Sequence, residues 1–341
     1  MDVGIVGGSG YGGGELLRLL AQHPVLKLRT VAARSAAGRP LAEVFPHLTG
    51  LAGSFAEVDP EAFRGCAAVF LATPHGASLE LAPALLDVLG DGVVVDLSGA
   101  FRLEAAAFEA AYGMVHSAPD LTPAVYGLPE LQRDALVGAR LVAGPGCYPT
   151  ASLLALAPLA GLVDPASVVV IGMSGTSGAG KGLRDDLHAS HVMGSITPYG
   201  VPSHRHGPEV AMQWGVLTGE PADVTFVPHL VPMPRGLLAT ATADLAQDTD
   251  PKAVRAAYER LYAGEPFVSL LPAGSWPATG NVAGGNAAHV AVAVDSAAGR
   301  VVASCAIDNL VKGAAGQAIQ AANVALELPE GAGLSALGVY P

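Results

Sequence analysis

The sequence predicts two domains, an α/β domain with a parallel sheet followed by an α+β domain with a largely antiparallel sheet. Over residues 1–146, short apolar strands alternate with helical patterns, which is typical of a parallel sheet with helices on both faces. A glycine-rich turn joins the first strand to the first helix. Beyond residue 147, strand-like runs follow one another with few helices between them, which favours an α+β domain with a largely antiparallel sheet.

Hydrophobic periodicity predicts the elements of the first domain. Residues 2–6 form a short apolar run, and Leu16, Leu19 and Leu20 recur at the spacing of one helix face. The expected elements are a strand at 2–6, a helix at 13–22, strands at 27–33 and 66–73, a helix at 77–89 and a strand at 93–98.

The second domain is predicted to begin at Cys147, after an apolar strand and a Gly-Pro-Gly turn. A last helix is expected to pack back on the first domain, which then comprises residues 1–146 and 313–341, while the second comprises 147–312. The expected elements are a helix at 149–159, strands at 168–173, 224–230, 237–245, 288–295 and 301–307, one interrupting helix at 251–263 and the last helix at 313–326.

The composition excludes several classes of protein. Of the 341 residues, 51% are hydrophobic and 14% are charged, so we expect a compact globular protein rather than a disordered one. The net charge of -12 disfavours nucleic acids and anionic membranes as partners. Few charges and much apolar surface are compatible with a homo-oligomer, a dimer or a tetramer.

Three widely spaced cysteines, Cys66, Cys147 and Cys305, indicate a reducing compartment. They form neither a disulfide framework nor a metal site by spacing. The first residues lack the basic start and apolar core of a signal peptide, and the most apolar stretch, 151–163, is too short to span a bilayer. We therefore expect a cytoplasmic protein.

Glycines at positions 7, 10 and 13 predict a Rossmann-type dinucleotide site. Such a turn brings backbone N–H groups and a helix N-terminus to a pyrophosphate, and it stands here between a first strand and an amphipathic helix, as that site requires. An ordinary tight turn is the alternative. The expected contacts are Gly7, Ser9, Gly10, Tyr11, Gly12 and Gly13, with Pro74 further along the chain.

The end of the second strand favours NADP(H) over NAD(H). An NAD enzyme usually has Asp or Glu there for the ribose 2′-hydroxyl, whereas residues 32–39 contain no carboxylate. Arg34 and Ser35 offer a charge and a hydroxyl to a 2′-phosphate. The alternative is that Arg34 is a solvated loop residue.

Cys147 has the position of a reactive thiol. It follows Gly-Pro-Gly and opens a helix, whose dipole favours the thiolate, and the glycines let ligands approach the sulfur. An inert buried thiol is the usual alternative, and we interpret Cys66 and Cys305 in that way because each lies inside an apolar strand.

A cluster at residues 203–209 offers proton-transfer groups to this thiol. Either His204 or His206 can serve as acid and base, with Glu209 orienting or tuning the imidazole. A surface loop is one alternative. A zinc site is another, but no third ligand has a convincing spacing, so no metal is expected.

Residues 174–181 follow a strand and suggest an anion-holding loop, Ser-Gly-Thr-Ser-Gly-Ala-Gly-Lys. A Walker A sequence would need Ser or Thr after the lysine, and Gly182 stands there instead. A nucleotide triphosphatase is therefore not expected.

Four separated motifs stand in this order along the chain: GPGCYPTASLLALAP, SGTSGAG, PYGVPSHRHGPEV and AIDNLVKGAAGQA. They closely resemble those of the N-acetyl-gamma-glutamyl-phosphate reductase family of arginine biosynthesis. The resemblance runs from GGSGYGGGELLRLL at the start to the end of the chain. It implies a Rossmann-type NADP domain, an α+β domain with the substrate site, and NADPH-dependent reduction of an N-acetylglutamyl phosphate through a Cys147 thioester.

The resemblance also assigns roles to residues. Cys147 takes the place of the nucleophile, His204 that of the acid and base, and Glu209 that of the residue assisting it. The chain departs from the family at Ala100, where Asp is frequent, and at Lys181, where Arg is usual. The other expected contacts are Arg102, Ser174 and Arg205 with the substrate, and Ser177, Gly178 and Asn309 with the cofactor.

Two other functions remain open at this point. A related group reduces carrier-bound aminoadipyl phosphate in lysine biosynthesis, but an acidic carrier would favour a basic rim, and the net charge of -12 argues against one. A non-catalytic NADP-binding sensor would be expected to lack the nucleophile or the acid and base, and both are present.

Overall fold

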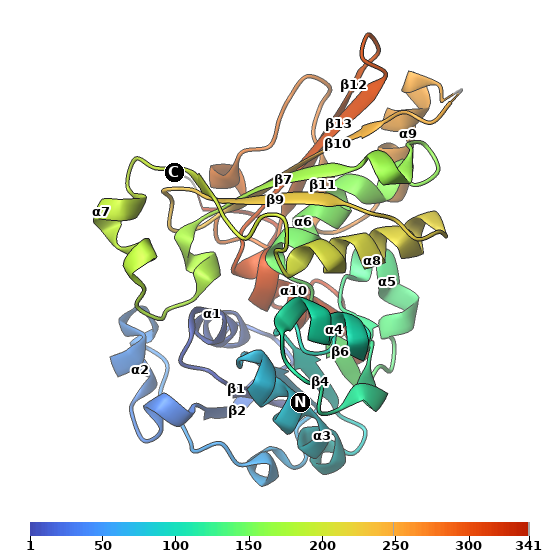
Figure 1. The fold of residues 1–341 in the computed structure, drawn as a ribbon. Helices are drawn as coiled ribbons and strands as arrows, with labels where there is room; N and C mark the ends of the chain where they lie inside the picture. Colours follow the sequence, from blue (N-terminus) through green and yellow to red (C-terminus); the bar gives the residue numbers. More distant parts are fainter. Residues whose placement is uncertain (248, 340–341) are drawn as a thin grey trace. The chain divides into compact units, whose positions relative to one another are not determined.

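The computed structural model describes residues 1–247 and 249–339, which form two compact units (Figure 1). Residues 1–146 and 314–334 form the first unit, and the second begins at Cys147. Residues 335–339 belong to the second unit, although the sequence analysis grouped them with the first. The reason is backbone pairing, because the N–H of Asn286 donates to Ser335 and that of Val339 donates to Ala283. Residues 340 and 341 lie outside the described residues.

The first unit contains a six-stranded sheet in the order β2-β1-β3-β4-β6-β5, and all of its neighbouring strands pair in parallel. The central strands β3 and β4 are buried along their whole length, as expected of a parallel sheet covered on both faces. The strands are β1 (Asp2–Val6), β2 (Lys27–Ala32), β3 (Ala68–Leu71), β4 (Val93–Asp96), β5 (Val125–Tyr126) and β6 (Leu141–Ala143).

Helices α1, α3 and α10 pack on this sheet. Helix α10 lies against β4, α1 and α5, and it is fastened by a hydrogen bond between Nε2 of the buried His23 and Oδ1 of Asn323, 3.1 Å apart. The helices are α1 (Tyr11–Leu20), α2 (Leu41–Val44), α3 (His75–Leu89), α4 (Ala105–Tyr112), α5 (Pro129–Leu136) and α10 (Gly316–Ala325).

The second unit contains a seven-stranded mixed sheet in the order β11-β12-β13-β10-β7-β9-β8. Its strand pairs are antiparallel except for β11·β12 and β7·β9. The sheet is therefore largely antiparallel, as predicted. The strands are β7 (Val169–Ser174), β8 (Thr197–Pro198), β9 (Thr225–Leu230), β10 (Leu237–Asp244), β11 (Val268–Leu270), β12 (Ala288–Asp295) and β13 (Arg300–Ile307).

Helices cover one face of this second sheet (Figure 1). Helix α6 (Cys147–Leu156) packs on β10, β13 and β12, and α8 (His206–Thr218) packs on α6 and β9. The expectation of a single helix among the strands was wrong, because α8 and the short α7 (Ala189–Val192) accompany α9 (Pro251–Leu261). Among the alternating side chains of β7, Ile171 and Met173 stay exposed.

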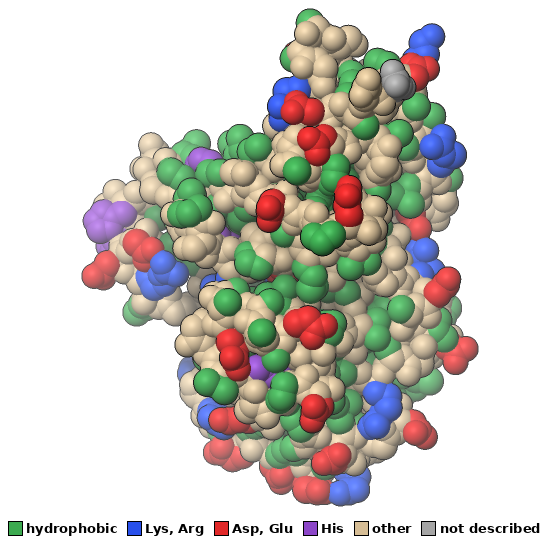
Figure 2. All heavy atoms as spheres, turned by 45° about the vertical axis from the view of Figure 1, so that its right-hand side comes forward, with side chains coloured by type: hydrophobic (Ala, Val, Ile, Leu, Met, Phe, Trp, Pro, Cys, Tyr) green, Lys and Arg blue, Asp and Glu red, His purple; other side chains and the backbone are tan. Residues whose placement is uncertain are grey.

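The surface mixes acidic and apolar groups. Figure 2 shows acidic side chains spread over the drawn face with hydrophobic ones between them, as the negative net charge leads one to expect. Among the described residues, no helix has both the length and the apolar character needed to span a membrane.

Candidate active site and cofactor site

The glycine turn of the first unit, residues 7–13, packs backbone against backbone at Gly7 and Gly13, at distances that leave no room for a side chain at either. Gly7 has a φ of +82°, which favours glycine, and its N–H donates to the carbonyl of Ala32 at the end of the neighbouring strand. A Cβ at Gly13 would lie 2.5 Å from the backbone of Gly8, so only glycine lets α1 pack this tightly. Gly10 is the N-cap of α1 and makes no side-chain cap hydrogen bond, so the first-turn N–H groups can bind an anion.

The other predicted cofactor residues of this unit lie at the same edge of the sheet. Ser9 and Ser35, after β1 and β2, have their hydroxyl oxygens 3.4 Å apart. Arg34 opens a short 3-10 turn and is exposed, so its guanidinium is accessible to a ligand beside that pair. Pro74 precedes α3 as its N-cap, after the adjacent strand β3. The glycine turn and these residues therefore follow the carboxyl ends of β1, β2 and β3, which are neighbours in the first sheet.

Arg102 has a different setting. It is 5% exposed, and its Nε donates to the carbonyl of Gly144 at 2.7 Å while Nη2 donates to that of Leu97 at 2.9 Å. These two bonds fix the loop that follows β4 against the turn before Cys147. The structure therefore gives Arg102 a role in holding the backbone, beside the substrate contact predicted from the resemblance.

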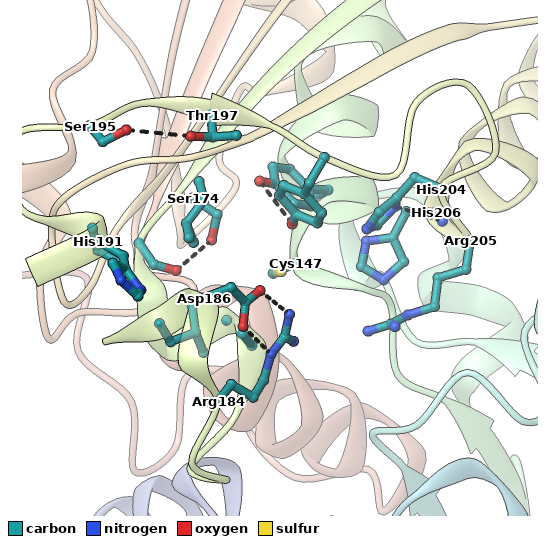
Figure 3. A pocket seen from close by; sticks show the side chains of 18 residues that line it. Cys147, Ser174, Arg184, Asp186, His191, Ser195, Thr197, His204, Arg205 and His206 are labelled. Carbon is teal, nitrogen blue, oxygen red and sulfur yellow. Dashed lines mark hydrogen bonds and ion pairs between the residues drawn. The ribbon is translucent and has the colours of Figure 1, made fainter. Parts of the chain in front are cut away.

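The second unit contains a cavity of about 550 Å³ beside Cys147 (Figure 3). Several predicted site residues line it together, although they come from distant parts of the sequence. Figure 3 shows the two histidines and Arg205 on one side of the sulfur, and Arg184, Asp186 and His191 on the other. The predicted residues that line it are Cys147, Ser174, Gly178, His204, Arg205 and His206.

Cys147 is the first residue of α6 and is partly exposed to the cavity. Cys66 and Cys305, in contrast, are buried, and burial raises the pKa of the Cys66 thiol. A Cβ at Gly313 would lie 2.8 Å from that of Cys147, so a glycine is needed beside the thiol. Position at a helix N-terminus and access to a cavity distinguish Cys147 from the other two cysteines.

Aromatic rings enclose His204. The ring centroids of His206, Tyr199 and Phe226 lie 4.9, 5.3 and 5.5 Å from its own, and that of Tyr148 lies 6.0 Å away. The hydroxyl of Tyr199 donates to that of Tyr148 at 3.4 Å, and Tyr148 in turn donates to the carbonyl of His229 at 3.0 Å. This chain of hydrogen bonds holds the two tyrosine rings against His204.

The surroundings of His204 also set its protonation. Burial, and then the charge of Arg205, lower the pKa of His204 to about 4, so the ring is neutral near pH 7. Its Nδ1 accepts the backbone N–H of His206 at 3.2 Å. An accepting Nδ1 carries no hydrogen, so the ring proton is on Nε2, and Nε2 is a donor.

Glu209 is 1% exposed and lies in the first turn of α8, three residues after His206. Side chains at this spacing share one face of a helix, which makes His206 the histidine beside it on α8. Glu209 is not among the described residues that line the cavity.

The loop after β7 is held by Asn309. Its Nδ2 donates to Oγ of Ser177 at 2.9 Å, and its Oδ1 accepts the N–H of Gly236 at 2.8 Å. A Cβ at Gly178 would lie 2.9 Å from Oγ of Ser174, so the glycine lets the loop fold closely over that hydroxyl. The structure thus brings together four predicted residues. Ser174, Ser177 and Gly178 belong to the end of β7 and the loop after it, and Asn309 holds this loop by its hydrogen bond to Ser177.

Sequence reasoning missed several residues of this cavity. Tyr199 encloses His204, and Arg184 and Asp186 line the far side of the cavity. Gly313, which is not among the described lining residues, packs on Cys147. The only signal for Tyr199 was its place in the third of the four motifs. Arg184 and Asp186 lie outside all four, and nothing in the sequence marked them.

Comparisons with known proteins agree with this architecture. Residues 2–139 match the family described as semialdehyde dehydrogenase, NAD binding domain, and residues 147–309 match semialdehyde dehydrogenase, dimerisation domain. Aspartate semialdehyde dehydrogenase II from Vibrio cholerae, complexed with ASA, has the same fold, with a TM-score of 0.73 at 18% identity over 96% of this chain and 98% of that one. The Candida albicans aspartate semialdehyde dehydrogenase with NADP has a TM-score of 0.68 at 16% identity, over 95% and 97%.

Much more similar relatives also exist. The N-acetyl-gamma-glutamyl-phosphate reductase of Streptomyces avermitilis is 50% identical over 99% of both chains, and that of Thermobifida fusca is 51% identical over 99% of this chain and 98% of its own. These matches confirm the resemblance that the four motifs indicated. The chain belongs to the semialdehyde dehydrogenase family of nicotinamide-dependent oxidoreductases, and within it to the N-acetyl-gamma-glutamyl-phosphate reductases.

Proposed function

We propose that the protein reduces N-acetyl-L-glutamyl 5-phosphate to N-acetyl-L-glutamate 5-semialdehyde and phosphate, with NADPH as the hydride donor and Cys147 as the nucleophile. The observation that carries this proposal is the cavity that combines a thiol at a helix N-terminus with the neutral, enclosed His204. The full-length similarity to reductases of this name supports the choice of substrate.

In the first step, the Cys147 thiolate attacks the acyl carbon and phosphate leaves, which forms a thioester. The N-terminus of α6 favours the thiolate, because its N–H groups and dipole stabilise negative charge. Arg205 lines the cavity beside His204 and is exposed, so it is placed to bind the phosphate. Arg102, the other arginine predicted to contact the substrate, belongs to the first unit and is not among the described residues that line this cavity.

The second step needs a hydride, which reduced nicotinamide supplies when bound. The first unit fits such a cofactor, since a side chain at Gly7 or Gly13 would clash with the backbone and the uncapped α1 N-terminus suits a pyrophosphate. The resulting oxyanion receives a hydrogen bond from Nε2 of His204, and its collapse breaks the C–S bond and releases the aldehyde and the Cys147 thiolate, with the proton kept on His204. A neutral ring with its proton on Nε2 suits the role of a hydrogen-bond donor to this oxyanion.

We propose that Arg34 and Ser35 select NADPH by binding the 2′-phosphate. Arg34→Ala is expected to raise KM for NADPH by about tenfold to a hundredfold, since bonds to charged groups contribute roughly 1.5–3 kcal/mol. KM for NADH should change little. The matched control is Arg39→Ala. Arg39 is another exposed arginine of the loop that follows β2, and it pairs with Glu43 of α2. Equal increases for both cofactors, measured in steady-state assays, would contradict this role.

The choice of acyl phosphate can be tested on the wild-type protein. We expect rapid oxidation of NADPH with free N-acetylglutamyl phosphate and little with aminoadipyl phosphate on an acidic carrier protein. Docking such a carrier would favour a basic surface, and the chain has 30 acidic and 18 basic residues. A faster rate with the carrier-bound substrate, in the same assay, would replace the proposed function by the lysine-pathway one.

We further propose that the protein forms a homo-oligomer. The family matched by residues 147–309 is described as a dimerisation domain, and Ile171 and Met173 are exposed on the second sheet. Burial of such side chains between two copies would be favourable. Sedimentation velocity should report a mass of at least twice the 34.2 kDa chain, and a monomer at micromolar concentration would contradict the proposal.

A further inference from the structure

Arg184 and Asp186 form an ion pair on the far side of the cavity from His204 (Figure 3). Nε of Arg184 donates to Oδ1 of Asp186 at 2.9 Å, and Nη2 donates to Oδ2. The two side chains are 53% and 60% exposed. An ion pair this exposed contributes little to stability, so the pair calls for an explanation other than folding.

The geometry of this pair leaves one edge of the guanidinium available. A guanidinium has five N–H donors in a fixed fork, and Asp186 uses the edge formed by Nε and Nη2. Among the described residues, Nη1 of Arg184 makes no hydrogen bond, so the edge formed by Nη1 and Nη2 can accept a second carboxylate in the bidentate mode. Asp186 meanwhile fixes the plane of the fork.

Two arginines with different neighbours line the cavity. Arg184 and Arg205 are the arginines that line it in the described part of the chain, and Figure 3 shows Arg184 beside Asp186 and Arg205 beside the two histidines. Arg205 adjoins His204, so Arg205 is the arginine for the reacting acyl phosphate. Ser195 and Thr197 also line the cavity, and their hydroxyl groups can hydrogen-bond an amide.

We infer that Arg184 binds the α-carboxylate of the substrate through its Nη1 and Nη2 edge, and that Asp186 is a positioning residue that holds the guanidinium for this contact. The inference rests on the proposed function, whose substrate has a carboxylate and an acylated amine at the end away from the phosphate. A fork held in place before binding loses less conformational freedom when the ligand arrives. The subsite therefore selects acyl phosphates that carry a free carboxylate.

The test uses the reaction in the aldehyde direction, with oxidised cofactor and inorganic phosphate. Two aldehydes are compared, N-acetylglutamate 5-semialdehyde and 4-acetamidobutanal, which lacks only the carboxylate. Arg184→Gln is expected to raise KM for the first by about tenfold to a hundredfold, with kcat little changed, and to leave KM for the second at its wild-type value. Asp186→Asn should raise KM for the first aldehyde by a smaller factor, because Arg184 is kept but no longer held.

Arg255→Gln is the matched control, because Arg255 also pairs with an exposed carboxylate, that of Glu259, on α9 and away from the cavity. It should change neither KM. An unchanged KM for the carboxylated aldehyde in Arg184→Gln, or equal increases for the two aldehydes, would overturn the inference and leave the proposed function intact. A wild-type protein inactive on the carboxylated aldehyde would remove the proposed function itself.

Discussion

Replacement of Cys147 by serine is expected to lower turnover by at least about a thousandfold and to leave NADPH binding intact. A serine hydroxyl at this position is a far weaker nucleophile near pH 7, because the N-terminus of α6 can stabilise a thiolate but cannot ionise an alcohol. The proposed cofactor contacts of the glycine turn belong to the first unit, so the substitution leaves them unaltered. Steady-state rates and NADPH titration by fluorescence provide the two measurements.

Cys66→Ala is the matched control for this substitution. Cys66 is buried in the first unit, outside the residues that line the cavity, so turnover should stay near the wild-type value. Near-normal turnover in Cys147→Ser would show that reduction does not pass through a bond to this sulfur.

His204→Asn is expected to lower kcat by roughly a hundredfold to a thousandfold, the usual contribution of a positioned donor to a developing oxyanion. The loss in His206→Asn should be much smaller. His204 presents a donor at Nε2 within the ring of aromatic side chains, whereas His206 is the first residue of α8 and supports His204 through its backbone N–H, which asparagine retains. Comparable losses in the two variants would undo the assignment between them.

The dependence of kcat on pH offers a further check on His204. Its pKa of about 4 lies below the ordinary value of 6.5, so the ring stays neutral as the pH falls from 8 to 5. Protonation of His204 should therefore reduce the rate only as the pH approaches 4. Tyr199→Ala, which opens one side of the aromatic enclosure, should move this acid limb toward higher pH because the ring becomes more hydrated.

Much of the fold could be predicted because its strands are short apolar runs bounded by turns. The predicted strand at 2–6 has the bounds of β1, and that at 288–295 has the bounds of β12. Helix α8 was missed because its first turn holds His206, Pro208 and Glu209, which suggested chemistry rather than a helix. The three-residue strand β11 is too short to give a pattern, and only its pairing with β12 defines it.

The candidate site could be predicted only where one segment carried a chemical signal. Cys147 and the histidines had such signals in the turn before α6 and in the cluster at 203–209. The protonation of His204 had none, since it follows from rings contributed by α6, β9 and the segment after β8. The pair of Arg184 and Asp186 likewise becomes meaningful only when the fold brings it to the cavity that Cys147 opens into.

The central claim is that the acyl group is transferred to Cys147 before it is reduced. The most direct test is mass spectrometry of the wild-type protein after mixing with N-acetylglutamyl phosphate in the absence of NADPH. The account predicts a mass increase of one N-acetylglutamyl group on the peptide that contains Cys147, and loss of that increase with formation of aldehyde when NADPH is added. An absent adduct, or an adduct on another residue that NADPH converts to aldehyde, would contradict it.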